Sequence, residues 1–142
     1  MSLFSAMAVS ASGMTAERTR AELLVENLAN AETTRTPEGG PYRRKDAVFA
    51  SEPMGANFGS LFEEHLQEGV TVQEISVDNR PPERRYLPGH PDAGPDGYVA
   101  FPRIDPAADM VDLTGAARGF QANVAAIAAV KDMLMRSIDL FK

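Results

Sequence analysis

Apolar residues recur with a helical period at both ends of the chain. In residues 109–142 they lie alternately three and four apart, and Lys131 is the one polar residue on this stripe. Residues 1–31 carry a stripe of the same period, interrupted at Ser10 and Glu17. The C-terminal stripe consists of Met110, Leu113, Ala117, Phe120, Val124, Ile127, Leu134, Ile138 and Phe141, and the N-terminal stripe of Leu3, Met7, Met14, Ala21, Leu24 and Leu28. The pattern predicts two long helices that pair as a coiled coil.

The middle of the chain has a different pattern, in which short alternating segments are separated by proline and glycine. We predict strands at residues 42–50, 70–77 and 98–101, with an irregularity in the second one at Gln73 and Glu74. The segments 53–59 and 80–105 are rich in loop-forming residues, and 60–67 is a short element of undefined type.

The predicted fold class is therefore α+β, divided into three segments of sequence. Residues 1–34 and 106–142 are expected to form a discontinuous coiled-coil domain of two helices, and residues 35–105 a small β-rich middle domain. A helix of about 30 residues extends ~45 Å, more than the width of a globular domain of this size, so we expect the helices to project from the middle.

Local signals mark the ends of the helices. Ser2 is the expected N-cap of the first helix, which should end near Asn30 in a left-handed C-cap. The second helix should open with Asp105 at the N-cap and Pro106 at the first helical position. Asp109 then lies near the positive end of the helix dipole.

A second stripe, made of small residues, runs along the back of the C-terminal helix. It consists of Gly115, Gly119, Ala122, Ala126 and Ala129, and lies about 200° around the helix from the large residues. An alanine-rich helix with small residues facing water is the alternative interpretation. Because glycine in an exposed helix interior costs about 1 kcal/mol, we favour a close contact with neighbouring subunits. Asn27 has no capping role, and we expect it to hydrogen-bond to a neighbouring chain.

Composition narrows the possible functions. The formal net charge is −6, which argues against nucleic-acid binding, and the basic run at residues 43–45 is interpreted as a solvated strand edge. The chain has no cysteine and no stretch of about 18 apolar residues. No Lys or Arg precedes the apolar run that begins at Leu3, so we expect no cleavable signal peptide.

Catalytic and metal-binding motifs were sought as well. His90, Asp92 and Asp96 share a Pro/Gly-rich loop, but their spacing fits neither an EF-hand nor a zinc motif, and His65 is far away in sequence. We interpret this loop as a rigid turn with solvated aspartates. No nucleophile elbow, phosphate-binding loop or dinucleotide fingerprint is present in the sequence, so we expect neither an enzyme nor a cofactor or metal.

Several segments carry a specific family resemblance. Residues 27–33 (NLANAET) resemble the N-terminal asparagine motif of the axial proteins of the bacterial flagellum, which form its rod and hook. Further similarity, to a proximal rod member of that family, lies in residues 39–45, 89–93, 96–99, 110–113 and 117–124. Glu26 and Phe120 depart from the usual family pattern, in which a small polar residue and a tyrosine stand there.

The resemblance implies a structural subunit of the basal-body rod, a tubular drive shaft that transmits torque and surrounds the export channel. It implies export through the flagellar type III apparatus and paired terminal helices that line the tube. Implied partners are copies of the chain itself, other proximal and distal rod proteins, the surrounding ring bushing and the export apparatus. It implies neither nucleic-acid binding nor direct membrane insertion.

The terminal helices are thus the predicted assembly surface. The residues assigned to helix packing or assembly are Leu3, Met7, Met14, Leu24, Asn27, Leu28, Asn30, Met110, Leu113, Gly115, Gly119, Phe120, Asn123, Val124, Ile127, Leu134 and Ile138. The alternative is a soluble coiled-coil adaptor, or a secretion-associated binding module, that docks one partner. Such a protein has no need of glycines on the back of its last helix.

Overall fold

The fold consists of two long helices and two antiparallel hairpins, as the computed structural model describes it for residues 3–53 and 68–140. The elements follow one another as α1 (Leu3–Ala29), β1 (Lys45–Pro53), β2 (Glu68–Val77), β3 (Glu83–Tyr86), β4 (Tyr98–Phe101) and α2 (Pro106–Asp139). The predicted α+β class is confirmed. The element predicted at residues 60–67 lies outside the described residues.

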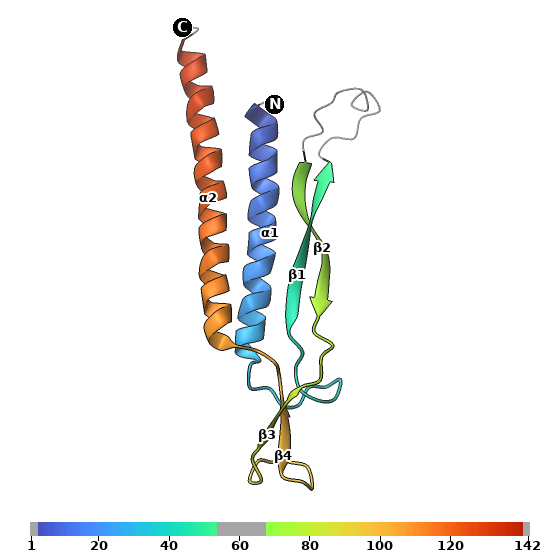
Figure 1. Cartoon of the computed structure of the whole chain (residues 1–142). Coiled ribbons are helices and arrows are strands. Elements are labelled where there is room, and N and C mark those ends of the chain that lie inside the picture. The colour runs from blue at the N-terminus through green and yellow to red at the C-terminus, as the bar shows by residue number, and fades with distance from the viewer. Residues whose placement is uncertain (1–2, 54–67, 141–142) are drawn as a thin grey trace.

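Helix α1 occupies the centre of the molecule. Helix α2 lies antiparallel along one side of it, and the β1–β2 hairpin lies along the other side (Figure 1). Among the described helices and strands, α2 packs only against α1. The expectation that both helices project from the middle is wrong for α1, because the hairpin covers it lengthwise.

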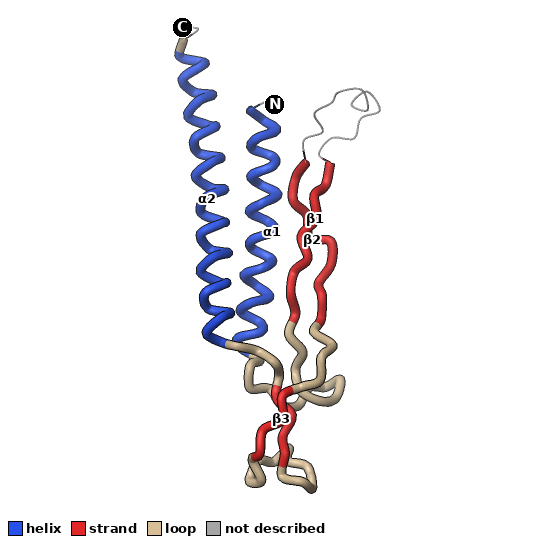
Figure 2. The backbone as a smooth tube through the Cα atoms, viewed as in Figure 1, coloured by secondary structure: helices blue, strands red, loops and turns tan. Residues whose placement is uncertain are grey.

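The two hairpins differ in length and regularity (Figure 2). In the first one, the pairs run from Lys45–Val77 to Pro53–Glu68. Val48 pairs with Glu74 and Phe49 with Val72, so Gln73 is the extra residue of a bulge. The predicted irregularity of this strand is confirmed.

The second hairpin joins β3 to β4, from the pair Glu83–Phe101 to the pair Tyr86–Tyr98. Strand β4 matches the prediction for residues 98–101. Strand β3 was not predicted, because its sequence is short, charged and preceded by two prolines. Its partner strand provides the burial that the sequence of β3 lacks, since Val99 and Phe101 are both buried.

The ends of the helices follow from capping. The Asp105 carboxylate accepts hydrogen bonds from the amides of Ala107 (3.0 Å) and Ala108 (3.4 Å), which confirms the predicted N-cap of α2. Helix α1 ends at Ala29, but no non-glycine residue in the described part of the chain has a positive φ. The prediction of a left-handed cap at Asn30 is therefore wrong.

The hydrophobic core is small for the amount of apolar surface. Among the described residues, the buried apolar side chains include Ala16, Leu23, Leu24, Tyr42, Val99, Phe101, Ala116 and Val130. Seventeen large apolar residues in the same part of the chain are exposed. Exposed apolar surface on this scale indicates that the chain functions in contact with other molecules.

Candidate assembly interface

The contact between the two helices uses only half of the predicted stripe of α2. One series at seven-residue spacing, Leu113, Phe120, Ile127 and Leu134, is half-buried. A second series, Asp109, Ala116, Asn123 and Val130, is buried or half-buried. The predicted companion series, Met110, Ala117, Val124 and Ile138, is exposed. The second observed series thus lies one residue before the predicted companion series. This difference turns that half of the contact by about 100° around the helix axis.

Two glycines allow the helices to approach closely. A Cβ atom at Gly13 of α1 would lie 3.0 Å from the Asn123 side chain of α2. Reciprocally, a Cβ atom at Gly119 would lie 3.0 Å from the carboxyl group of Glu17. Gly119 therefore faces α1, and its predicted place on the back of α2 is wrong. Gly115 has open space around it and remains on the outer side.

The remaining α1 residues assigned to packing lie at several depths. Leu24 is buried, whereas Leu3, Met7, Met14 and Leu28 are half-buried. Continuing the register defined by Gly13 and Asn123 brings Leu3 to the same level as Met133 along the helix axes. The last two turns of α2 therefore extend beyond α1, which explains why Ile138 is exposed (55 %).

Asn27 is fully buried and binds within its own chain. Its amide donates to the carbonyl oxygen of Lys45 (2.8 Å), and its side-chain oxygen accepts from the Lys45 amide (3.0 Å) and the Tyr42 hydroxyl (3.0 Å). These bonds use the groups that a neighbouring strand would use, and they hold the start of β1 against α1. The prediction that Asn27 binds a neighbouring chain is wrong.

Asn30 also acts locally, one turn further on. Its amide donates to the Glu26 carbonyl oxygen (2.9 Å), and its side-chain oxygen accepts from the Thr33 hydroxyl (3.2 Å). These contacts satisfy the end of α1, where carbonyl groups lack partners in the helix.

Tyr42 completes the cluster beside Asn27. Burial raises the pKa of the Tyr42 hydroxyl to about 12, and the negative charge of Glu26 adds to the effect. The Lys45 ammonium group forms an ion pair with Glu26 at 2.6 Å. The last turn of α1 is therefore tied to the start of β1 by both neutral and charged groups.

A buried ion pair joins the start of α2 to the same region. Arg44 donates to the Asp109 carboxylate, whose side chain is completely buried, and the charge of Arg44 is shared with Asp46. The second oxygen of Asp109 has no hydrogen-bond partner in the structure. Breaking a buried pair of this kind is costly, since one charge would be left without a partner. The basic run at 43–45 is thus more than the solvated edge that we predicted.

The loop at residues 89–97 is tied to the rest of the molecule. The Thr34 hydroxyl donates to Asp92 (2.8 Å), and Asp96 forms an ion pair with Arg84. The His90 ring accepts a hydrogen bond from the amide of Asp92 (3.1 Å). These aspartates are bonded rather than simply solvated, which corrects the interpretation made from sequence.

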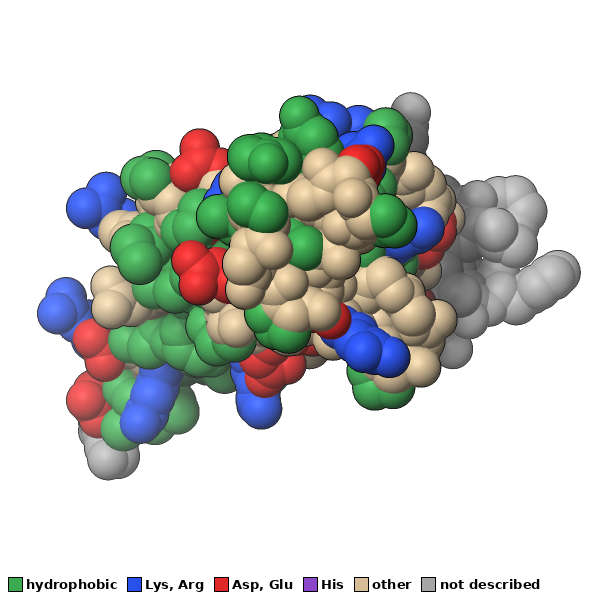
Figure 3. Space-filling view, turned by 90° about the horizontal axis from the view of Figure 1, so that it is seen from below, with side chains coloured by type: hydrophobic (Ala, Val, Ile, Leu, Met, Phe, Trp, Pro, Cys, Tyr) green, Lys and Arg blue, Asp and Glu red, His purple; other side chains and the backbone are tan. Residues whose placement is uncertain are grey.

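Helix α2 carries apolar surface that no other described helix or strand covers. We use the open face of α2 as a collective name for its exposed large apolar residues, which are Met110, Val124 and Met135 on one flank of the helix contact, Val111, Met133 and Leu140 on the other flank, and Ile138 beyond the end of α1. Small residues lie between them, among them Gly115, Ala122 and Ala126, all exposed. In the view from below, apolar side chains gather on the side of α2 (Figure 3).

Sequence reasoning missed Gly13 and Glu17 as members of the helix contact. Each helix contains a glycine followed four residues later by a polar residue, Gly13 with Glu17 and Gly119 with Asn123. In an antiparallel pair, each glycine can then face the polar residue of the other helix. This repeated spacing was the available signal.

Comparison with known proteins places these features in a class. Residues 96–140 match the family described as flagellar basal body rod FlgEFG protein C-terminal. This segment contains β4 and all of α2, so the match covers the helix with the open face. It relates this part of the chain to the class of flagellar basal-body rod proteins.

Full-length relatives give the particular family. The chain is 38 % identical to the flagellar basal-body rod protein FlgC of Bacillus subtilis over 152 aligned positions, covering 100 % of both chains. It is 34 % identical to FlgC of Borreliella burgdorferi (100 % and 99 % covered) and 31 % identical to FlgC of Salmonella typhimurium (99 % and 98 % covered). The chain belongs to the FlgC family of flagellar basal-body rod proteins.

Membership of this family also confirms two predictions. The resemblance to flagellar axial proteins is correct, and the chain is a structural protein rather than an enzyme. Neither helix in the described ranges has the length and apolarity needed to cross a bilayer.

Proposed function

We propose that the chain is a subunit of the tubular rod and enters it through the open face of α2. The observation that carries the proposal is the exposure of that face, where Met110, Val111 and Met135 are 60 %, 71 % and 54 % exposed. A surface of this kind is unfavourable in water and becomes favourable once neighbouring subunits cover it. Contacts between different patches of identical subunits produce rings or helical tubes.

We also propose that the chain divides into two domains. Residues 1–34 and 106–142 form a core domain in which α1 and α2 pair as a coiled coil, and residues 35–105 form the middle domain. The seven-residue spacing on the α1 side of α2 supports the pairing. In this assembly the predicted series Met110, Val124 and Ile138 contacts neighbouring subunits, while Leu113, Phe120, Ile127 and Leu134 hold the subunit together.

The proposed partners are other copies of this chain and the other proximal and distal rod proteins. Contacts with the surrounding ring and the export apparatus, and export without a cleavable signal, belong to the same proposal. An adaptor that binds one partner is less well supported, because exposed apolar and small residues continue along both flanks of the helix contact.

Substitution of one residue on the open face tests the proposal. Val124 is 42 % exposed, so Val124→Glu should change the free energy of unfolding of the free chain by less than about 0.5 kcal/mol. In cells that lack the wild-type chain, the variant should be absent from purified basal bodies, and the cells should not swim. Val124→Met keeps the position apolar and is the matched control, expected to assemble.

The free energy of unfolding reports on folding, and the amount of each variant in purified basal bodies reports on assembly. Normal amounts of Val124→Glu in basal bodies would show that the open face is not an assembly surface. Loss of both variants from basal bodies, with normal folding, would place position 124 in the assembly contact and show that its shape matters as well as its apolar character.

A further inference from the structure

Charge is distributed unevenly along the β1–β2 hairpin. Residues 46–79 contain seven Asp or Glu residues and no Lys or Arg. Basic residues flank this acidic stretch on both sides, with Arg43 and Arg44 before it and Arg80 after it. Because β1 starts at Lys45 and β2 ends at Val77, both flanks meet at the same end of the hairpin, which we name its base.

The base contains a cleft lined by four arginines. Arg43, Arg44, Arg80 and Arg103 surround a space of about 110 Å³, and the acidic residue among the lining residues is Asp78. The loop after α1, the loop after β2 and the segment after β4 contribute to it, so the cleft depends on the folded chain.

Two of these arginines lack a carboxylate partner. Arg80 forms an ion pair with Asp78 at 2.6 Å, and Arg44 is paired with Asp46 and Asp109. Arg43 donates to the neutral side chain of Asn79 (2.8 Å), and Arg103 has no carboxylate within 4.0 Å in the described ranges. Arg43 and Arg103 are both exposed. The cleft therefore presents an excess of positive charge to solvent, and Arg103 interacts with Asp78 and Glu83 only through longer-range electrostatics.

The positive charge of Arg103 also affects the pKa of the nearby Asp78 carboxyl. The Arg80 hydrogen bonds hold the pKa of the Asp78 carboxyl at about 2, and Arg103 contributes to the lowering. Asp78 thus remains ionised and bound to Arg80, which leaves the guanidinium groups of Arg43 and Arg103 for an external anion.

The opposite end of the hairpin has the complementary charge. Glu52 precedes the last residue of β1, and Glu68 is the first residue of β2, paired with Pro53. Both glutamates are exposed, and neither has an ion pair within residues 3–53 and 68–140. Among the described residues, the far end of the hairpin therefore carries negative charge that no ion pair neutralises.

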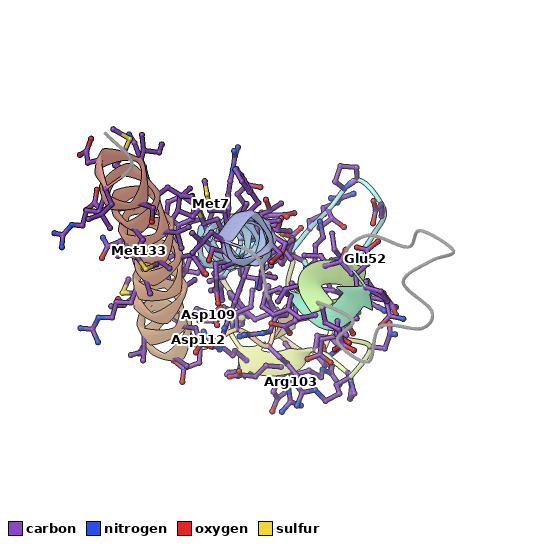
Figure 4. The ribbon with its side chains drawn as sticks, turned by 90° about the horizontal axis from the view of Figure 1, so that it is seen from above. Met7, Glu52, Arg103, Asp109, Asp112 and Met133 are labelled. Atoms are coloured by element: carbon purple, nitrogen blue, oxygen red, sulfur yellow. The ribbon has the colours of Figure 1, made fainter. Side chains whose placement is uncertain are left out.

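These two ends cannot meet within one molecule. A strand of nine residues spans about 30 Å, so the acidic end lies about that far from the base. Figure 1 shows the two ends at opposite limits of the hairpin, and Figure 4, which looks down the long axis of the molecule, labels both Glu52 and Arg103. A second copy displaced along the hairpin by its own length would bring its end beside the first.

We propose that the arginine cleft at the base of one subunit binds the acidic end of the β1–β2 hairpin of a second copy. The contact is head-to-tail, so each copy uses one end as donor and the other as acceptor, and the interaction can be repeated. It deepens the proposed rod assembly and rests on it. The planar guanidinium group suits a carboxylate partner, since it can donate two parallel hydrogen bonds.

The contact sets position rather than providing most of the affinity. Exposed ion pairs are weak and screened by salt, whereas complementary charges guide encounter and fix register. The open face of α2 provides the apolar burial, and the hairpin contact determines how far one subunit is displaced from the next.

Cysteine cross-linking of the full chain tests the proposal directly, because the sequence contains no cysteine. We expect a mixture of Glu52→Cys and Arg103→Cys chains to form disulfide-linked heterodimers at least several-fold faster than either variant alone. A chain that carries both substitutions should form a ladder of oligomers. Glu22→Cys mixed with Arg103→Cys is the matched control, since Glu22 is an exposed glutamate on α1 and should link at background rate.

Charge reversal provides a second measurement on the same surfaces. Arg103→Glu should reduce the association of the full chain measured by sedimentation, and a partner carrying Glu52→Arg should restore it. Raising the salt concentration to about 1 M shortens the Debye length to ~3 Å and should slow the specific cross-link. Equal rates for the test pair and the control, or no rescue by the reversed partner, would overturn the proposal.

Purified basal bodies separate this proposal from the rod function itself. If the chain is incorporated but the cleft cysteine links only to a different rod protein, the occupant is that protein and a second copy is wrong. If the chain is incorporated without any link at the cleft, the contact is wrong and the rod function stands. Absence of the wild-type chain from basal bodies would instead contradict the proposed function.

Discussion

The Asn27 side chain forms the two hydrogen bonds to the β1 backbone that a neighbouring strand would otherwise form. Its amide bonds to both backbone groups of Lys45, the residue at which β1 begins, and it also accepts from the Tyr42 hydroxyl. A residue of α1 thereby fixes where the hairpin starts. Sequence reasoning noted that Asn is unusual inside a helix but could not identify the partner, which is 18 residues away.

Replacing Asn27 should therefore destabilise the free chain. We expect Asn27→Ala to lower the free energy of unfolding by about 2–4 kcal/mol, because it leaves the Lys45 backbone and the Tyr42 hydroxyl without partners. Asn30→Ala removes only local bonds at the end of α1 and should cost about 0.5–1.5 kcal/mol. Urea denaturation followed by circular dichroism measures both, and equal losses would contradict the assigned role of Asn27.

Tyr42 should make stability depend on pH in the alkaline range. Its pKa in the folded chain is about 12, against an ordinary value of 10.0, because burial and the charge of Glu26 disfavour the tyrosinate. The unfolded chain releases this proton first, so the contribution is complete below pH 10 and is lost as the pH rises to about 12. Tyr42→Phe should abolish the late step in a tyrosine absorbance titration, whereas Tyr86→Phe should leave it in place.

At the scale of elements, the helix pair depends on the two reciprocal glycine contacts. The periodicity of the sequence correctly predicted both helices and half of the α2 seam, because Leu113, Phe120, Ile127 and Leu134 do face α1. It failed for the other half, since the seam includes Asp109 and Asn123, which a hydrophobicity pattern does not select. Arg44 binds one oxygen of the Asp109 carboxylate, and the Asn123 amide donates to the Gly119 carbonyl oxygen of its own helix (3.0 Å).

The two glycines of α2 should respond differently to alanine. Gly115→Ala should raise the free energy of unfolding by about 0.5–1 kcal/mol, because alanine favours the helix and meets no atom within 4 Å. Gly119→Ala places a Cβ atom 3.0 Å from Glu17, so it should gain less or lose stability. Thermal unfolding of both variants measures the difference, and equal gains would argue against the close approach of the helices.

At the scale of the whole molecule, α1 is the element on which everything else packs. It contacts α2 on one side and both strands of the first hairpin on the other. The sequence predicted the fold class, the helix limits and the family, since these depend on local patterns and motifs. It could not predict that the hairpin lies along α1, because this packing joins segments with no shared periodicity.

The central position of α1 predicts a gradient of local stability. In the dilute chain, the amide hydrogens of α1 around Leu23 and Leu24 should exchange most slowly, because these residues are buried between two neighbours. The turns of α2 beyond Leu134, which extend past α1, should exchange fastest among the helical amides. Hydrogen exchange measured by mass spectrometry would contradict this arrangement if both regions were equally protected.

The open face of α2 has a chemical consequence that arises from its methionines. Met110, Met133 and Met135 expose their side chains by 60 %, 48 % and 54 %. Oxidation of a thioether to the sulfoxide turns a flexible apolar side chain into a polar one. A free subunit that meets an oxidant would thereby lose the apolar character of its proposed assembly surface, whereas neighbouring subunits in the proposed rod contact would shield the same sulfur atoms. Sensitivity to oxidants should therefore be confined to the interval before the subunit is incorporated.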